Sequence, residues 1–372
     1  MGNQTPGKIL RILLEEGEKS RQELAVRMEM SVPAISQNIG LLERRGLARD
    51  GGMFDSTGGR KARIVSPVPD ARYAIGLDVT ENRLSGVLID LSENIVEERQ
   101  RKLRYENSPE YGAQAGELVR ELLSARPRAS EKTLGVGVSL PGILAHDRNT
   151  LAYSHILRVG GVPKEQFART MELPIALVND AKAAAIAECS VRRERGNAVY
   201  LSLSATVGGA VVLNGHVQEG NHQHSGEFGH MTLVPDGRRC YCGQYGCVDA
   251  YCACGSLTGG EPQGLDAFFA ALDAGDPASL RRWQDYARHL ATVINNLQNA
   301  LDSPVILGGF VGAALNERRL AELRALTRER STFTPADEDL TACRYRRSAA
   351  AVGAAILYVE PFLESIESGP TG

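Results

Sequence analysis

One histidine and three cysteines lie close together within residues 226–247 of this 372-residue chain. They are His230, Cys240, Cys242 and Cys247. Gly243 and Gly246 permit the sharp turns of a small chelate, because glycine readily adopts positive φ. Four nitrogen or sulfur ligands complete the tetrahedron of a structural zinc site, whereas a zinc hydrolase needs an open position for water. We therefore predict that these residues bind a structural Zn2+ ion.

A carboxylate precedes this histidine by three residues, at Glu227. A side chain next to a metal-fixed histidine is held at a defined place. We therefore interpret Glu227 as a hydrogen-bond acceptor for a polar ligand. The alternative is a surface salt bridge for Glu227 beside thiols that bind no metal.

The pattern GExGH followed by CxCGxxGCxE resembles the signature of the ROK family, which groups sugar kinases with sugar-responsive transcriptional repressors. The chain matches this pattern except at Asp249, where the family has Glu. The resemblance implies an α/β, multi-domain protein. It implies an N-terminal winged helix-turn-helix followed by a two-lobed, actin-like and ribonuclease H-like sugar-kinase fold, whose ligands are expected in the cleft between the lobes.

The composition is that of a globular protein, with 43% hydrophobic and 23% charged residues. We find neither an apolar run long enough to cross a bilayer nor a signal pattern, so we predict a cytoplasmic protein without a membrane partner. The net charge is −3, yet residues 1–63 carry eleven Lys or Arg against eight Asp or Glu. A basic head on an acidic body fits a nucleic-acid module joined to a ligand domain.

Residues 1–66 have the pattern of three short helices and a two-stranded wing. Ser20 and Glu23 form a capping box, and Ser31 can cap a third helix that runs to Arg45. Two helices joined by a short turn are typical of a helix-turn-helix, in which the second helix enters the DNA major groove. A protein-interaction module of the same fold is the alternative. The head also resembles the N-terminal region of ROK repressors, where a GGR wing is typical.

Two segments of this head carry the predicted DNA contacts. On the third helix Gln and Asn can pair with adenine, and a glycine-rich wing lets an Arg approach a narrow minor groove. The predicted DNA-binding residues are Ser31, Pro33, Ser36, Gln37, Asn38, Gly58, Gly59, Arg60 and Lys61.

The body follows a short linker, residues 67–72. Strand patterns at 73–79, 84–90 and 95–104, a helix at 108–124 and a strand at 134–140 predict a mixed sheet. A similar series begins at 198–203 and 210–213, which suggests an internal duplication. We predict a first lobe over 73–178, a second lobe with the zinc site over 179–348, and a last helix, 349–363, that packs back on the first lobe.

The two loops that hold phosphates in family kinases have lost most of their glycines. Residues 78–82 read DVTEN where the family has DxGGT, and residues 204–208 read SATVG where the family has GTGxG. A phosphate cradle needs close backbone approach and N–H donors without a nearby negative charge. We infer that the chain does not use ATP and is not an enzyme.

The sugar-binding half keeps its polar residues. By resemblance, Asp180 matches the general base of ROK kinases, and without ATP it becomes a vestigial base that only accepts hydrogen bonds. The sugar contacts that the resemblance implies are Asn179, Asp180, Glu227, His230, Asp249, Pro141 and Gly142. The alternative for Asn179 and Asp180 is an ordinary helix cap.

The sequence therefore predicts a sugar-responsive transcriptional regulator, a repressor that binds operator DNA as a homodimer or homotetramer. A sugar or sugar derivative is the predicted effector. Three alternatives stay open at this point: an active ATP-dependent sugar kinase with a fused DNA-binding head, a zinc hydrolase, and a constitutive DNA-binding protein whose sugar pocket no longer functions.

Overall fold

The computed structural model describes residues 5–53, 63–192, 196–260 and 264–367. Its N-terminal head is a winged helix, as predicted, with the strands in the order β1-β3-β2. The head consists of α1 (Thr5–Glu16), β1 (Lys19–Ser20), α2 (Arg21–Arg27), α3 (Val32–Arg44), β2 (Ala48–Met53) and β3 (Arg63–Pro67).

Local side-chain chemistry fixes the ends of the head helices. The Glu23 N–H donates to Ser20 Oγ at 3.2 Å, and the Ser20 N–H donates to the Glu23 carboxylate at 2.7 Å, so the predicted capping box is confirmed. Ser31 Oγ accepts from the Ala34 N–H and begins α3. The predicted linker is wrong in one detail, because Pro67 still belongs to β3, where it pairs with Ala48. Strand pairing there outweighs the turn tendency of proline.

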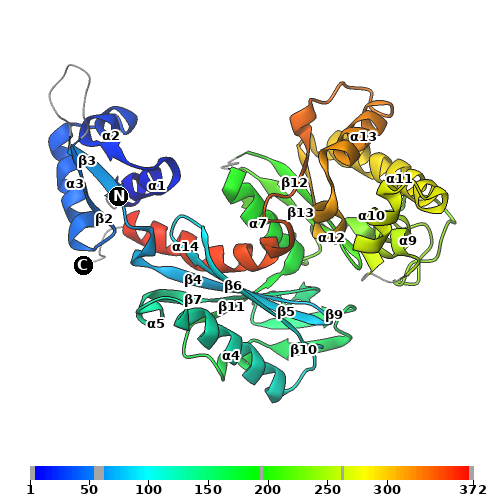
Figure 1. Ribbon diagram of the computed structural model, residues 1–372, viewed down its shortest axis with the longest axis horizontal. Helices are drawn as coiled ribbons and strands as arrows, with labels where there is room; N and C mark the ends of the chain where they lie inside the picture. Colours follow the sequence, from blue (N-terminus) through cyan, green and yellow to red (C-terminus); the bar gives the residue numbers. More distant parts are fainter. Residues whose placement is uncertain (1–4, 54–62, 193–195, 261–263, 368–372) are drawn as a thin grey trace.

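The first lobe is built on a five-stranded sheet of order β11-β7-β4-β5-β6, with a 3-10 turn, η1 (Pro69–Ala71), leading into it. Helix α4 and helix α14 cover opposite faces of this sheet (Figure 1). The elements are β4 (Tyr73–Val79), β5 (Arg83–Asp90), β6 (Ile95–Lys102), α4 (Pro109–Ser124), α5 (Ala129–Lys132), β7 (Thr133–Leu140), β11 (Ile175–Asn179) and α14 (Ala349–Glu367).

A second sheet repeats this arrangement with the order β14-β13-β12-β15-β16. In each sheet three parallel strands continue into an antiparallel hairpin, so the duplication predicted from the sequence is confirmed as two sheets of the same topology. The strands are β12 (Ala198–Leu203), β13 (Val207–Leu213), β14 (His216–Val217), β15 (Val305–Gly308) and β16 (Leu340–Ala342). The helices of this half are α8 (Asp249–Cys252), α9 (Gly255–Thr258), α10 (Leu265–Asp273), α11 (Pro277–Leu301), α12 (Gly309–Ala314) and α13 (Glu317–Arg328).

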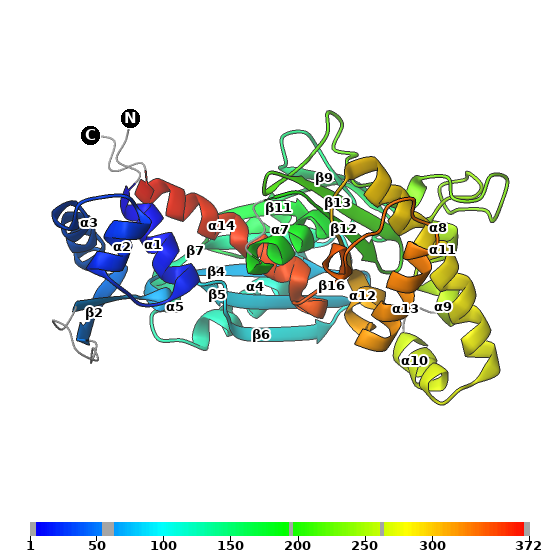
Figure 2. The same ribbon diagram turned by 90° about the horizontal axis from the view of Figure 1, so that it is seen from above.

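Helix α7 (Asp180–Arg192) lies between the two sheets and packs against α14, as both views show (Figures 1 and 2). The contact is close because of a glycine. A Cβ at Gly353 of α14 would lie 1.7 Å from the Ala183 carbonyl oxygen of α7. Helix α14 also crosses the first sheet, where a Cβ at Gly76 would lie 1.7 Å from the Ala351 carbonyl oxygen. These backbone contacts join α7, α14 and the first sheet into one packed unit.

Residues 346–366, which include most of α14, are long and apolar enough to cross a membrane. The prediction that the chain has no such run is therefore wrong as a statement about length and composition. In the structure 56% of the apolar window is buried, and its side chains join the core beneath the head. The apolarity of α14 thus has an explanation within the fold.

A small sheet that the sequence analysis did not predict follows β7. It consists of β8 (Ile143–Leu144), β9 (Thr150–Ser154) and β10 (Val159–Pro163), in the order β10-β9-β8, and α6 (Glu165–Ala168) leads on to β11. Its strands are only two to five residues long and their buried and exposed residues do not alternate regularly, so periodicity does not reveal them. This sheet lies beside the cleft described next.

Candidate functional site

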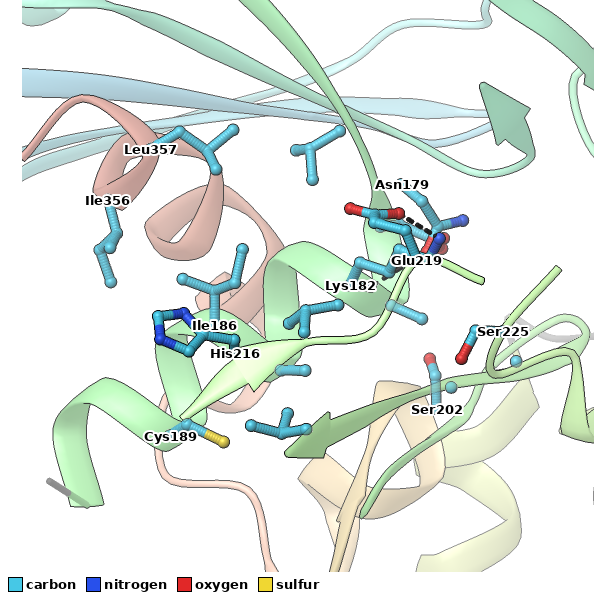
Figure 3. A pocket seen from close by; sticks show the side chains of 18 of the residues that line it. Asn179, Lys182, Ile186, Cys189, Ser202, His216, Glu219, Ser225, Ile356 and Leu357 are labelled. Atoms are coloured by element: carbon cyan, nitrogen blue, oxygen red, sulfur yellow. Dashed lines mark hydrogen bonds and ion pairs between the residues drawn. The ribbon is translucent and has the colours of Figure 1, made fainter. Parts of the chain in front are cut away.

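A cavity of about 1500 Å³ opens between the two lobes. Six of the seven predicted sugar contacts line it: Pro141, Gly142, Asn179, Asp180, Glu227 and His230. The cavity continues along α7 past Ile186 and Cys189 to Ile356 and Leu357 of α14 (Figure 3). Its far end reaches Arg11 of the head. The structure thus brings residues from distant parts of the chain into one cavity that runs from the cleft to the head.

Asn179 and Asp180 lie where β11 ends and α7 begins. The Asn179 amide donates to the Gly142 carbonyl at 2.9 Å, and its oxygen accepts from the Lys182 N–H at 3.0 Å. Asn179 therefore caps α7 and also holds the loop after β7. Gly142 is required there, because its φ is 137° and a Cβ would lie 2.4 Å from the Tyr153 carbonyl oxygen.

Asp180 provides a half-buried carboxylate at the start of α7. Burial raises its pKa to about 7, and the nearby carboxylates of Asp78 and Glu227 act in the same direction. The Asp180 carboxyl therefore titrates near neutral pH. When ionised, its oxygens can accept hydrogen bonds from ligand hydroxyl groups.

Asp249 differs from the other predicted sugar contacts, because it is not among the described residues that line the cavity. Its carboxylate is buried at the start of α8 and accepts from the Val207 N–H at 2.7 Å. The sugar contact expected at this position stays a prediction. The short side chain of Asp249 is used to hold the loop between β12 and β13.

The four predicted metal ligands form a compact cluster. Ligand atoms of His230, Cys240, Cys242 and Cys247 lie within 4.8 Å of one another. The Cys242 and Cys247 sulfurs are 3.8 Å apart. Tetrahedral zinc with Zn–S bonds of about 2.3 Å places its sulfurs about 3.8 Å apart, so the donor set and its spacing fit zinc.

Two glycines shape the loop that carries these cysteines. Gly243 and Gly246 have φ values of 93° and 76°. A Cβ at Gly246 would lie 1.8 Å from the Val234 carbonyl oxygen. The loop can therefore close on itself only with glycine at position 246, as the sequence analysis predicted for its turns.

In the loops that hold phosphates in family kinases, three backbone N–H groups donate to oxygens of the protein. The Thr80 N–H donates to the Arg83 carbonyl at 2.9 Å, and the Ser204 N–H donates to the Thr206 carbonyl at 3.0 Å. The Val207 N–H is already taken by Asp249. These three N–H groups are therefore engaged within the protein.

An arginine also crosses this part of the cleft. Arg83 Nη2 lies 3.6 Å from the buried carboxylate of Asp78, and its guanidinium lies 5.9 Å from the centre of the Phe310 ring. Asp78 and Arg83 belong to the first lobe and Phe310 to the second. The face of an aromatic ring attracts a cation, so the contact between Arg83 and Phe310 joins the two lobes.

Sequence reasoning missed several polar residues of the cavity. Lys182 Nζ lies 2.5 Å from the Glu219 carboxylate, which also pairs with Arg148 (Figure 3 shows Lys182 and Glu219). Burial lowers the pKa of Lys182 to about 8, with Arg148 adding to the effect. Its place two residues after Asp180, on the first turn of α7, is a signal that could have identified it. Arg148 and Glu219 lie in loops without such a pattern.

The predicted DNA-binding residues of α3 divide into two groups. Ser31, Pro33 and Gln37 are exposed and Ser36 is partly exposed. Asn38 is only 7% exposed, and its amide donates to the Ala34 carbonyl at 2.8 Å. Its predicted place on the outer face is therefore wrong, because it lies beside Ile35 and Ile39 on the core side. The predicted wing residues Gly58, Gly59, Arg60 and Lys61 lie outside the described residues.

Comparisons with known proteins agree with this architecture. A family model described as "ROK family" matches residues 74–360, and one described as "Winged helix-turn-helix DNA-binding" matches residues 3–49. The chain is 24% identical to the xylose repressor of Bacillus subtilis over 307 residues, which are 80% of each protein. It is 31% identical to the N-acetylmannosamine kinase of Escherichia coli over 296 residues, covering 76% of this chain and 97% of the kinase.

A solved structure shares the whole arrangement. The crystal structure of a ROK family transcriptional regulator, a homologue of the Escherichia coli MLC protein, covers 98% of both chains with a TM-score of 0.73 at 20% identity. That likeness shows the fold of head and body together. Because the family model spans most of the sequence, and the duplicated sheets agree with it, this protein belongs to the ROK family.

Proposed function

We propose that this protein is a sugar-responsive transcriptional repressor of the cytoplasm, whose head binds operator DNA and whose cleft binds a sugar or sugar derivative. The names of its relatives, a xylose repressor among them, support this function. The observation that carries the proposal is the packed connection between the cleft and the head, formed by α7, α14 and α1.

The connection begins at the cleft. Helix α7 starts with Asp180, and Asn179 caps it. A ligand that moves the end of β11 therefore moves α7. Because α7 meets α14 through the backbone contact at Gly353, the two helices are expected to shift together.

The connection ends on the head. Both Nη atoms of Arg11 donate to the Glu360 carboxylate at 2.9 Å, which joins α1 to α14. Apolar side chains of α1 share a buried cluster with those of α14: Ile9, Leu10, Leu13, Val352, Ile356, Val359 and Leu363. A shift of α14 would therefore change the position of the head.

The turn between β5 and β6 joins the same elements. The Ser190 hydroxyl, near the end of α7, donates to the Glu93 carboxylate, and the Ser92 hydroxyl donates to the Leu14 carbonyl of α1. Burial raises the pKa of Glu93 to about 7. This junction is a second contact through which α7 and the head would affect each other.

On the DNA side we propose that α3 enters the major groove with Ser31, Pro33, Ser36 and Gln37, and that the wing at 58–61 contacts the backbone or minor groove. Asn38 is not part of this surface, because it is buried. A homodimer or homotetramer would place paired heads on the two half-sites of a pseudo-palindrome.

We propose zinc as the ion of the His-Cys-Cys-Cys cluster, with a structural role. Four protein ligands leave no position for a reacting water molecule. The ion would hold His230, and with it Glu227, at the cleft, much as outer-shell groups orient a metal ligand. The chain's own residues would then bind the sugar with Asn179, Asp180, Glu227, His230 and the Gly142 loop.

An active sugar kinase is the second candidate, because the Escherichia coli kinase is 31% identical. The internally bonded N–H groups of Thr80, Ser204 and Val207 favour the absence of phosphoryl transfer. The carboxylate of Asp249 beside the second loop would also repel a phosphate. Sugar-dependent release of ADP would establish the kinase instead.

The test of the proposed function measures operator affinity with and without sugars. DNA fragments are selected for binding from random sequence, and affinities are measured at fixed salt with xylose, glucose, mannose and N-acetylmannosamine. At least one sugar is expected to change the affinity about tenfold, within the usual range of allosteric coupling. If no sugar changes DNA binding, the function is not that of a sugar-responsive repressor.

A pair of variants tests the connection itself. Arg11→Met removes the contact with Glu360 and is expected to reduce the effect of the sugar on DNA affinity at least about threefold. The matched control is Arg21→Met, because Arg21 pairs with Glu43 inside the head. A full sugar response in Arg11→Met would show that this contact does not transmit the signal.

A further inference from the structure

Two segments from different lobes meet at the cleft beside the predicted sugar contacts. One is the β9–β10 connection of the first lobe, which carries His155, and the other is the cysteine loop of the second lobe, which carries Tyr241. The two rings are stacked, with centroids 4.1 Å apart and planes 16° apart. Neither residue was singled out by the sequence analysis.

Tyr241 also reaches the sugar side of the cluster. Its hydroxyl lies 3.1 Å from His230 Nε2, within hydrogen-bond distance. Tyr241, His155 and Tyr153 line the same cavity as Asp180 and Glu227. Tyr241 is 43% exposed, so part of its ring is available to a ligand.

A second bridge between the lobes lies in the same cavity. Arg148, in the β8–β9 turn of the first lobe, pairs with Glu219, which follows β14 in the second lobe. Glu219 in turn pairs with Lys182 of α7. The small β8–β10 sheet is thus connected to the second lobe through an ion pair at one point and through an aromatic stack at another.

We propose that Tyr241 is an effector-contacting residue and that His155 positions it, so that the pair forms a clasp that closes the lobes on the bound sugar. The inference rests on the proposed function. An aromatic ring at the cavity offers an apolar surface to the C–H face of a sugar ring, while Asp180 and Glu227 accept its hydroxyl groups. Because Tyr241 lies between two cysteines of the metal cluster, the ordered loop would hold the ring at the cleft.

The clasp explains how a ligand bound by the first lobe would affect the second lobe. Asn179 and the Gly142 loop lie at the ends of strands of the first sheet. Glu227 and His230 belong to the second lobe. A sugar that touches both sides would be held best when His155 and Tyr241 are stacked. Closure would then be favoured by the sugar, as population shift requires.

The experiment measures sugar affinity by calorimetry in the full-length, metal-loaded protein. The probes are xylose, glucose, mannose and N-acetylmannosamine, and the tightest of them is carried forward. Tyr241→Ala is expected to weaken binding by about tenfold or more, since it removes the aromatic surface for the sugar ring and the hydroxyl that contacts His230 Nε2. Tyr241→Phe keeps the ring and is expected to lose only about threefold.

His155→Ala is expected to weaken binding by about three- to tenfold. The double variant should resemble Tyr241→Ala alone, because a positioning residue has little effect once its target is gone. Additive losses would mean that His155 does not act through Tyr241. They would contradict the clasp while leaving Tyr241 as a contact.

Tyr245→Ala is the matched control. Tyr245 lies in the same loop, is 57% exposed and is not among the described residues that line the cavity. The sugar affinity of the Tyr245→Ala variant should equal that of the wild type. Metal content is measured for every variant, and an unchanged metal content in Tyr241→Ala separates loss of the contact from collapse of the loop.

Two failures can be told apart. If the wild type binds none of the sugars, the proposed function fails, and the clasp has no effector to hold. If the wild type binds a sugar and Tyr241→Ala binds it equally well, the clasp is wrong while the proposed function stands.

Discussion

The two halves of the cleft differ in how their polar groups are used. On the sugar side, Asp180 and Glu227 line the cavity with carboxylate oxygens that can meet a ligand. On the side where family kinases hold ATP, the N–H groups of Thr80 and Val207 already donate to oxygens of the chain. The same fold thus presents carboxylate oxygens at the cavity in one half and internally bonded N–H groups in the other.

In our proposal, this difference is how a kinase scaffold loses the nucleotide and keeps the sugar. A phosphate site depends on backbone donors that glycine leaves accessible, so a few substitutions remove it. A sugar site depends on side-chain acceptors held by strand ends and, in our proposal, by a metal. The contact of Arg83 with Phe310 adds a bridge between the lobes on the nucleotide side.

Loss of a metal ligand should damage the sugar half most. Cys247 is 2% exposed, and Cys247→Ser is expected to lower the free energy of unfolding by more than about 4 kcal/mol, as loss of a structural metal does. Denaturant unfolding and metal content measure the effect. The control is Cys343→Ser, a buried cysteine outside the cluster, for which about 1 kcal/mol is expected. Equal effects of the two substitutions, with no metal in the wild type, would contradict the zinc site.

Asp180→Asn tests the acceptor at the cleft. Removing the charge should weaken sugar binding by about tenfold to a hundredfold, since hydrogen bonds to charged groups contribute about 1.5–3 kcal/mol. The matched variant Asp249→Asn should leave sugar affinity within about threefold, because Asp249 faces the Val207 N–H. Calorimetry measures both. A larger loss in Asp249→Asn would restore Asp249 as a sugar contact.

Ligand-induced thermal shifts compare the halves directly. A sugar present at about 100 times its dissociation constant stabilises the folded state by about 2.7 kcal/mol and should raise the melting temperature by several degrees. ATP with Mg2+ at the same concentration should not raise it, because the N–H groups of Thr80, Ser204 and Val207 are occupied. A comparable shift with ATP would show that the nucleotide half still binds.

The sequence predicted the regular elements well where periodicity and caps were strong. The Ser20–Glu23 capping box and the strand at 198–203 are where the patterns placed them. The β8–β10 sheet was missed because its short strands carry no clear alternation.

The candidate site was predictable only in part. His230 could be identified from local spacing and Asp180 from the resemblance to ROK kinases, and the structure brings both to the cleft. Arg148 and Tyr241 could not, since each acts through a partner from the other lobe that only the fold brings near. Asn38 was misplaced because its polar type outweighed its helical position between Ile35 and Ile39.

The smallest expected effect is the pH dependence that Asp180 contributes to the sugar half. The pKa of Asp180 is raised to about 7, whereas an unfolded Asp has a pKa of about 3.9, so the folded protein binds this proton more tightly. Its contribution to stability is present below about pH 4 and is lost as the pH rises through 7. Sugar affinity should change in the opposite direction, because the ionised carboxylate is the better acceptor, and should rise between pH 6 and 8.

Glu93 and Asp249, with pKa values raised to about 7 and about 6, titrate in the same window, so the wild type alone does not isolate Asp180. The measurement is therefore a difference between the wild type and Asp180→Asn, by calorimetry for affinity and by denaturant unfolding for stability. The rise in affinity with pH should disappear in the variant, and stability should fall less with pH than in the wild type. If both slopes persist in Asp180→Asn, the titrating group is another one, and the carboxylate at the start of α7 is not the acceptor that distinguishes the sugar half from the nucleotide half.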